Sequence, residues 1–525
     1  MDGSGSGKSA SYSIPNAYQC LGSYVFTDPK GELYDRTAGY LKEQGYDIKV
    51  LNLVRPQYSD GYNPLMHISS ELDVDVIANT IVKGQKTDSG SDPYWDDMAE
   101  MLLKALIYYL IATRPEEEQN LASCAELVRA ANKNGGSNLL SDLMSQLPYD
   151  HPARMYYKSI EIAPEKTYGS ILSSLQSKLG KFDSKEIAEL TSTDTINFEE
   201  IGSKKTAVYV ISSDTHTAYD FLLTIFFSQM IQQLYDYADQ NGGKLKERTY
   251  FILDEFANIG KIPDFDKKIS TSRSRGISFS VILQNIDQLE AVYEKSYETI
   301  MGNCDTHVFL GSNSFKTVEY FSKQLGEKTI DRDSISINKD KQNHRTGKSV
   351  SDQIMARALM TPDELRRLDN DLCIIFEKGL KPVKANKYYY FKHPMAKDMA
   401  KCEISHNDIG EIDRGTWRKY NPYNPYVEEK DEKSVKNLNI ESLDDLFEDD
   451  NVKEENNNIK NNLNVPKDEK KSEEITNSLD DFLDLNMQND DNAPMLPQDD
   501  EEDTYDLQKE LEAKFDELFG PLEDD

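Results

Sequence analysis

The feature that most constrains the fold is a run of small residues with one lysine at the start of the chain, Gly3-Ser4-Gly5-Ser6-Gly7-Lys8-Ser9. A glycine-rich turn that opens a helix presents several backbone N–H groups to an anion, because residues without side chains let the backbone come close. Lys8 is placed to reach the outer phosphates of a nucleotide, and the Ser9 hydroxyl is placed to bind Mg²⁺. The run predicts a phosphate loop with these nucleotide contacts: Gly3, Gly5, Ser6, Gly7, Lys8 and Ser9.

The phosphate loop departs from the usual pattern in two respects. Asp2 stands where the pattern has its first glycine, and Met1 and Asp2 are too few for the strand that normally precedes such a loop. We therefore expect that the chain starts inside the motif. A Gly/Ser linker followed by a chance Gly-Lys-Ser is the alternative interpretation.

The second signal is an apolar strand, Tyr250–Leu253, that ends in Asp254 and Glu255. A carboxylate at the carboxyl end of a parallel strand stands beside a phosphate loop and can hold Mg²⁺ through its water shell. Ser9 and Asp254 are thus the predicted metal ligands, and Glu255 is placed to orient or deprotonate an attacking water. A strand that ends in Asp-Glu is often only an ordinary turn, but together with the phosphate loop it predicts hydrolysis of ATP with Mg²⁺.

Further residues complete a predicted catalytic set of Glu255, Gln284, Arg273 and Arg275. Gln284 follows the apolar run Phe279–Leu283 and is placed either to sense the γ-phosphate or only to cap the strand. Arg273 and Arg275 lie in the sequence between the strand that ends in Asp254-Glu255 and the strand that ends before Gln284, and they are candidates to stabilise transition-state charge in the site of a neighbouring subunit. Surface cations, or contacts to a phosphate backbone, are the alternative roles for both arginines.

Strands and helices alternate in two separate parts of the chain. Ser23–Thr27, a helix over Tyr34–Gln44 and Asp47–Leu53 have the β-α-β order of a parallel sheet. Between Pro93 and about Leu190 the apolar residues recur at helical spacing, and no convincing strand is present. Strands return at Ala207–Ile211, Thr249–Leu253, Phe279–Leu283, His307–Leu310 and Leu372–Phe376. We predict an α/β sheet domain over 1–88 and 198–427, an inserted all-helical domain over 89–197, and a tail over 428–525.

The tail is strongly acidic. It holds 34 Asp and Glu against 10 Lys and Arg, a net of −24 out of −33 for the chain, so the preceding 427 residues carry only about −9. Low hydrophobicity with high net charge predicts disorder. Three short acidic-apolar islands, 442–447, 478–483 and 515–519, favour a tail that binds a protein partner, with an uneven solvating tail as the alternative.

Other classes of site are disfavoured. The five cysteines are scattered without a Cys-x-x-Cys pair, which argues against a disulfide framework or a zinc site. No apolar run reaches the roughly 18 to 20 residues that a membrane helix needs, so we expect a chain that is not itself inserted in a membrane. The aromatic run Tyr388–Phe391 is expected in the core or at a sheet edge, rather than as a platform on which a base stacks.

Taken together, the motifs resemble the type IV secretion coupling proteins of conjugative elements. Besides the phosphate loop, the resemblance is carried by Thr27-Asp-Pro-Lys-Gly-Glu-Leu33, Tyr250-Phe-Ile-Leu-Asp-Glu-Phe-Ala-Asn-Ile-Gly260, Thr271-Ser-Arg-Ser-Arg-Gly276 and Ile282-Leu-Gln-Asn285. It implies a RecA-like P-loop NTPase domain, an inserted all-helical domain and a ring-shaped homo-hexamer. It also implies that Asp28 and Lys30 lie near the nucleotide.

The resemblance further implies ATP and Mg²⁺ as cofactors and a DNA-stimulated ATPase. Such a protein recruits relaxase-bound single-stranded DNA and drives its transfer through a secretion channel, with relaxosome and channel proteins as partners. Members of the family usually carry N-terminal membrane helices, so the implied location is the cytoplasmic face of the cell membrane. The alternatives are a related RecA-like DNA translocase for segregation or packaging, and a non-catalytic adaptor with a broken phosphate loop.

Overall fold

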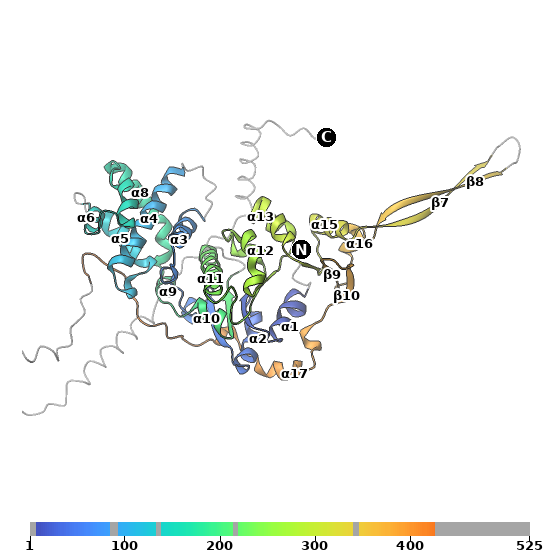
Figure 1. Cartoon of the computed structure of the whole chain (residues 1–525), viewed down its shortest axis with the longest axis horizontal. Coiled ribbons are helices and arrows are strands. Elements are labelled where there is room, and N and C mark those ends of the chain that lie inside the picture. The colour runs from blue at the N-terminus through green and yellow to red at the C-terminus, as the bar shows by residue number, and fades with distance from the viewer. Residues whose placement is uncertain (1–6, 85–92, 133–137, 214–218, 340–345, 426–525) are drawn as a thin grey trace, which may run out of the picture. The chain divides into compact units, whose positions relative to one another are not determined.

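The structure is a computed structural model, and it describes residues 7–84, 93–132, 138–213, 219–339 and 346–425 (Figure 1). The chain divides into two units, 1–429 and 430–525, and all described residues belong to the first. The loop residues Gly3, Gly5 and Ser6 and the acidic tail from residue 428 lie outside the described residues. What the sequence predicts for them therefore stays a prediction.

A five-stranded parallel sheet in the order β2-β3-β1-β4-β5 forms the base of the fold. Its strands are β1 (Ser23–Thr27), β2 (Asp47–Asn52), β3 (Thr206–Ile211), β4 (Thr249–Leu253) and β5 (Ile277–Val281). Thr27 is paired with both Val210 and Leu253, and Leu253 is paired with Val281. The carboxyl ends of these strands therefore lie level with one another at one edge of the sheet.

Both faces of this sheet are covered, which explains why its central strands are apolar without alternation. Val25 of β1 belongs to a core shared with the helices between β2 and β3 and with α11 (Asp220–Gln240). Tyr24 and Phe26 belong to a second core, which includes α1 (Ile14–Ala17) and α2 (Glu32–Glu43). A slip of one residue would move Val25 into the second core and Tyr24 and Phe26 into the first, so the different side-chain sizes in the two cores oppose it.

Between β2 and β3 the described residues form helices and no strand. The helices are α3 (Glu71–Lys83), α4 (Pro93–Thr113), α5 (Leu121–Asn132), α6 (Leu139–Ser145), α7 (Pro152–Glu161), α8 (Glu165–Leu179), α9 (Lys185–Leu190) and α10 (Phe198–Ser203). α4 lies at their centre and contacts α3, α5, α7 and α8. The predicted fold class, an α/β sheet with an inserted helical region, is confirmed, while the boundaries at residues 89 and 197 stay predictions.

Two smaller β structures and several helices follow the parallel sheet. The helices are α12 (Phe265–Arg275), α13 (Ile286–Tyr293), α14 (Tyr297–Gly302), α15 (Phe315–Leu325), α16 (Pro362–Arg366) and α17 (Ala396–Met399). The strands are β6 (Thr306–Phe309), β9 (Leu372–Glu377) and β10 (Val383–Asn386) in an antiparallel sheet, and the paired β7 (Glu327–Lys339) and β8 (Thr346–Ala358). Every helix of the described ranges is too short or too polar to cross a membrane.

The aromatic run Tyr388–Phe391 is placed differently from the expectation of a core or sheet-edge position. β10 ends at Asn386, so the run belongs to no strand, and Tyr388 and Phe391 are 48% and 59% exposed. Tyr390 packs against the second core, but the expectation was wrong for Tyr388 and Phe391, because it relied on the strand preference of aromatic residues alone. Four successive aromatic residues show no polar-apolar alternation that would indicate a half-buried strand.

The last described segment returns to earlier parts of the chain. The backbone N–H of Ile404 donates to the Asp35 carbonyl on α2 at 3.1 Å. Further along, the N–H of Tyr420 donates to Ser123 Oγ on α5 at 2.9 Å. Residues 396–425 therefore contact both a helix that covers the sheet and a helix of the insertion.

Candidate nucleotide site

The predicted site residues gather where the strands of the parallel sheet end. Asp254 follows β4 directly, and Gln284 follows β5 after a short turn. Thr27, the last residue of β1, donates from Oγ1 to the Asp254 carbonyl at 2.7 Å and so ties two strand ends together. Ligands of open α/β sheets bind beyond the carboxyl ends of the strands. The fold thus brings Asp254 and Gln284 to the edge where a ligand would bind.

The described end of the phosphate loop lies against β4. Gly7 has a φ of +70°, a conformation that glycine adopts without steric cost. The chain then enters a helical turn, η2 (Ser9–Ser13), which continues into α1. Ser9 Oγ donates to Asp254 Oδ2 at 3.1 Å, although the two residues are 245 positions apart. The two predicted metal ligands are therefore direct neighbours.

Lys8 carries a buried ammonium group. Its Nζ is shielded from solvent, and no group in the described part of the chain accepts a hydrogen bond from it. A buried cation without a partner is costly, so it marks a position where an anion belongs. Asp254 is 9% exposed, and burial raises the pKa of its carboxyl, whereas the charge of Lys8 and the hydrogen bond from Ser9 act in the opposite direction.

Glu255 is held in a strained backbone conformation. Its φ of +50° lies in the left-handed region, which costs a residue other than glycine about 1 kcal/mol or more and recurs at functional sites. Its Oε1 accepts from Gln284 Nε2 at 2.9 Å, and its Oε2 accepts from Asn258 Nδ2 at 3.1 Å. Two side-chain amides thus hold this carboxylate in place beside Asp254.

Arg273 and Arg275 lie at the opposite edge of the sheet. They end α12, which leads into the amino end of β5. Arg275 donates from Nε and Nη2 to the two carboxylate oxygens of Asp239, at 2.9 and 3.0 Å, and so is engaged within the chain. The Arg273 side chain is 89% exposed. The structure brings neither arginine to Asp254, and a role for Arg273 in a neighbouring subunit stays a prediction.

Asp28 and Lys30 follow β1 at the carboxyl edge, but their side chains meet other groups. Asp28 is buried, and its Oδ2 accepts from the N–H of Tyr34 at 2.8 Å, so it caps α2. Burial raises the pKa of Asp28 to about 6. Lys30 lines a small hollow of about 90 Å³ together with Arg55 and His406. In the described residues neither side chain bonds to the phosphate loop, and their nucleotide contacts stay predictions.

Magnesium and a triphosphate fit the arrangement around Asp254. Within the described ranges no three His, Cys, Asp or Glu side chains come together as a metal cage. Mg²⁺ is usually held by one or two protein ligands together with phosphate oxygens and waters, and Ser9 and Asp254 offer such a pair. The buried ammonium of Lys8 offers the positive charge that phosphate oxygens need. These residues therefore suit a magnesium nucleotide better than a metal held by protein alone.

Two supporting residues were missed by the sequence analysis. Thr27 ties β1 to the Asp254 carbonyl, and its signal was a hydroxyl at the very end of an apolar strand. Asn258 holds Glu255 from η7 (Phe256–Ile259), and its signal was the spacing of three residues, which places two side chains on the same face of a 3₁₀ turn. Both residues stand inside the motifs quoted above, but the motifs do not say that their side chains bind the Asp254 carbonyl and the Glu255 carboxylate.

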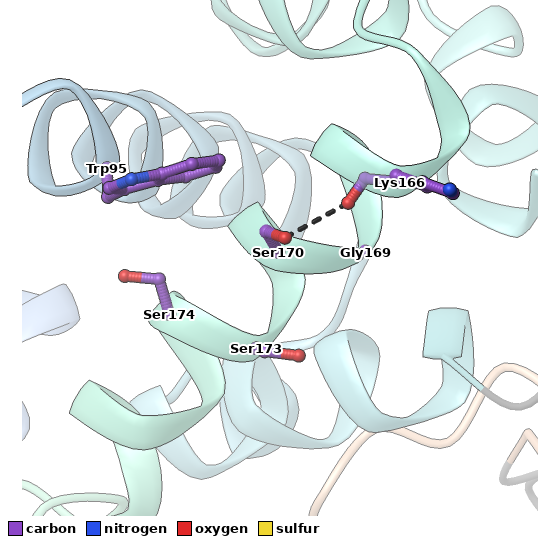
Figure 2. A pocket seen from close by; sticks show the side chains of 6 residues that line it. All are labelled: Trp95, Lys166, Gly169, Ser170, Ser173 and Ser174. Atoms are coloured by element: carbon purple, nitrogen blue, oxygen red, sulfur yellow. Dashed lines mark hydrogen bonds between the residues drawn. The ribbon is translucent and has the colours of Figure 1, made fainter.

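A larger hollow lies in the helical insertion and is a separate feature. It has a volume of about 640 Å³, is open to solvent, and is lined by Trp95 of α4 and small residues of α8. Figure 2 shows Lys166 directed away from the Trp95 indole, while Ser170 Oγ donates to the Lys166 carbonyl at 3.0 Å. None of the predicted site residues lines this hollow, so size alone does not locate the site.

The sequence of this chain is similar to those of known conjugation proteins. The family described as "Type IV secretory system Conjugative DNA transfer" matches residues 1–409. The conjugal transfer protein TraG of Escherichia coli is 25% identical over 427 residues, which cover 74% of this chain and 66% of that protein. Protein VirD4 of Rhizobium rhizogenes is 25% identical over 422 residues, which cover 76% of this chain and 59% of that protein. The chain thus spans less than two thirds of the length of these relatives.

Solved structures share the fold. The plasmid coupling protein TrwB in complex with the ATP analogue ADPNP has a TM-score of 0.53 at 17% identity, covering 79% of this chain and 87% of that chain. An unbound form of TrwB has a TM-score of 0.51 at 18% identity, covering 73% and 82%. This likeness confirms the RecA-like fold with its all-helical domain. The match over residues 1–409 shows that the chain belongs to the type IV secretory system conjugative DNA transfer family.

Proposed function

We propose that this chain is an ATP-hydrolysing coupling protein, which recruits relaxase-bound single-stranded DNA and drives its transfer through a type IV secretion channel. The observation that carries the proposal is the 3.1 Å hydrogen bond from Ser9 Oγ to Asp254 Oδ2. The buried, unpaired ammonium of Lys8 supports it. Lysine, hydroxyl and carboxylate in this combination form the magnesium and phosphate centre of P-loop NTPases.

Each residue of the site has its own task in this proposal. Lys8 neutralises phosphate oxygens, and Ser9 and Asp254 hold Mg²⁺. The nucleotide, when bound, supplies a γ-phosphoryl group whose transfer needs positioning and charge neutralisation rather than covalent help. Glu255 orients the attacking water and accepts its proton, while Gln284 fixes the Glu255 carboxylate through the 2.9 Å hydrogen bond.

The partners in the proposal follow from the family and from what a motor must do. A motor that moves any strand must grip phosphates rather than read bases, so its DNA binding should weaken steeply with salt. Because the first 427 residues carry a net charge of about −9, the cations must be concentrated on the surface that meets DNA. Relaxosome and channel proteins, a homo-hexamer, a protein partner for the tail and a place at the cytoplasmic face of the membrane complete the proposal.

The proposal is tested by measuring phosphate release from ATP by the full chain, with and without single-stranded DNA. Lys8→Ala should lose both nucleotide binding and turnover. Glu255→Gln should keep binding but lose turnover by at least about 100-fold, since it removes the group that handles the water proton. Lys267→Ala, which changes an exposed lysine of α12, is the matched control and should behave as the wild type.

The outcomes separate the alternatives. Turnover that survives both Lys8→Ala and Glu255→Gln contradicts the site. A wild-type chain that binds ATP without turning it over supports the non-catalytic adaptor. Stimulation by duplex DNA but not by single strands supports the related translocase for segregation or packaging.

A further inference from the structure

An aromatic segment reaches the phosphate loop from near the other end of the described chain. Tyr389 lies against Gly7, because a Cβ placed on this glycine would be 3.0 Å from Tyr389 Cε1. Gly7 directly precedes Lys8, the residue with the buried and unpaired ammonium. The Tyr389 ring is therefore a neighbour of the part of the loop that would hold phosphates.

Tyr389 is held in position by the hydrogen bonds of its own hydroxyl and by those of Lys387, two residues earlier. The hydroxyl donates to Asp371 Oδ1 at 3.1 Å and to the Asn370 carbonyl at 3.4 Å. The N–H of Lys387 donates to the Asp371 carbonyl at 2.7 Å, and Lys387 Nζ donates to the Leu310 carbonyl at 2.8 Å. The ring is thus ordered before any ligand arrives, which lowers the entropic cost of using it as a contact surface.

Phe391 extends this aromatic surface beyond Tyr389. The rings of Tyr389 and Phe391 are stacked, with centroids 5.1 Å apart and an angle of 9° between their planes. Phe391 is 59% exposed, so an apolar ring stacked on Tyr389 remains open to solvent. Covering such a ring is favourable, and a nucleobase is a flat π system suited to it.

We propose that the exposed surface of the Tyr389–Phe391 pair is the nucleobase subsite of the nucleotide site, and that it takes a purine without distinguishing adenine from guanine. The inference rests on the proposed function, because the phosphate loop must hold the triphosphate. The polar atoms of Asn370 and Asp371 that meet Tyr389 already accept from its hydroxyl. Lys392 Nζ lies 5.1 Å from the Tyr389 ring centroid, so the exposed Phe391 ring offers the open stacking surface. Stacking depends on π area, and a purine covers more of this ring than a pyrimidine.

The test is calorimetric titration of the full chain, in the presence of Mg²⁺, with ATP, GTP, CTP and inorganic tripolyphosphate, which has no base. Phe391→Ala and Tyr389→Ala should each raise the Kd for ATP and GTP by at least about fivefold, the lower end of the contribution of one base–aromatic stack. The Kd for tripolyphosphate should stay within about twofold. Phe391→Trp should restore ATP affinity, and Tyr388→Ala, an exposed neighbour outside the stacked pair, should leave it unchanged.

Three results would overturn the subsite. Equal weakening of ATP and tripolyphosphate means that the rings only shape the loop, and unchanged ATP affinity in both alanine variants means that no base rests on them. CTP that binds the wild type as tightly as ATP removes the purine preference. Failure of the proposed function looks different, because the wild type then binds neither ATP nor tripolyphosphate, or Lys8→Ala binds both normally.

Discussion

The two edges of the parallel sheet carry their charges in different ways. At the carboxyl edge, the Lys8 ammonium and the Asp254 carboxylate are buried, and Lys8 lacks a hydrogen-bond acceptor among the described residues. At the amino edge, Arg275 and Asp239 form a bidentate pair close to solvent. The presence of charged side chains alone therefore does not mark a site. A buried cation without an acceptor marks a site where motif residues such as Ser9 and Asp254 lie beside it, because Lys181 Nζ in the helical insertion is also buried without an acceptor in the described residues.

The largest expected difference between the two edges is in turnover. Asp254→Ala should lower ATP hydrolysis by about 1000-fold, because it removes a magnesium ligand and with it several kcal/mol of transition-state stabilisation. Asp239→Ala should change turnover by less than about twofold. Steady-state phosphate release at saturating ATP measures both. Similar losses of turnover in the two variants would contradict the placement of the site at the carboxyl edge.

A second buried carboxylate at the carboxyl edge has a hydrogen-bond partner within the chain. Asp28 shares the carboxyl edge, but its partner is the N–H of Tyr34, and burial raises its pKa to about 6. The folded protein thus binds the Asp28 proton more tightly than the unfolded chain does. Its stabilisation is present below about pH 4 and is lost as the pH rises through about 6, a change of roughly 3 kcal/mol from the difference in pKa.

The matched variant for this effect is Asp28→Asn, which keeps an acceptor for Tyr34 but does not titrate. Urea unfolding at several pH values between 4 and 7.5 should show that the wild type loses stability relative to Asp28→Asn as the pH rises. Parallel pH profiles for the two proteins would mean that the Asp28 carboxyl does not titrate between these limits. ATP turnover of Asp28→Asn tests the separate prediction that Asp28 contacts the nucleotide.

The strands of the parallel sheet could be predicted because both of their faces are buried. Ser23–Thr27 and Thr249–Leu253 were predicted to the residue, since continuous apolar runs bounded by polar turns leave little choice. The ribbon of β7 and β8 was missed because its two strands pair only with each other. Charged residues such as Asp331, Arg332 and Asp333 interrupt the polar-apolar alternation by which a strand is predicted from sequence.

The site was predictable to the extent that it consists of motif residues at strand ends. The sequence predicted that Ser9 and Asp254 share a metal, and the structure places Ser9 Oγ 3.1 Å from Asp254 Oδ2. Arg273 and Arg275 directly precede the strand that leads to Gln284, so their order in the chain already indicates its amino end, and a place beside Asp254 was the wrong expectation. The stacked Tyr389 is over 380 residues from the loop it contacts, and that contact depends on the three-dimensional course of the chain.

A smaller effect is expected where Gln284 holds Glu255. Gln284→Ala should lower kcat by about tenfold and leave KM unchanged, because one hydrogen bond to a charged group contributes roughly 1.5 kcal/mol and orients the group only for the chemical step. Gln284→Glu should be worse, since it sets two carboxylates against each other. A rise in KM with an unchanged kcat would instead place Gln284 in nucleotide binding and would separate it from Glu255.

The smallest effect is expected at the amino edge. Arg275→Ala should reduce the free energy of unfolding by about 1 kcal/mol, because an exposed bidentate pair with Asp239 and a cation–π contact at 4.8 Å from the Tyr235 ring contribute no more than that. ATP turnover should not change. Arg273→Ala, at a largely exposed side chain, is the control and should alter stability by less than about 0.5 kcal/mol.

The same two variants decide whether the amino edge is only structural. If Arg275→Ala lowered turnover as strongly as Asp254→Ala, burial of a charge without a hydrogen-bond acceptor would no longer separate a site from a structural ion pair. If Arg273→Ala kept its stability but lost turnover in the assembled protein, the amino edge of one subunit would serve the carboxyl edge of another. The exposed arginine would then be the cation that completes a neighbour's site, and its exposure in a single chain would follow from that role.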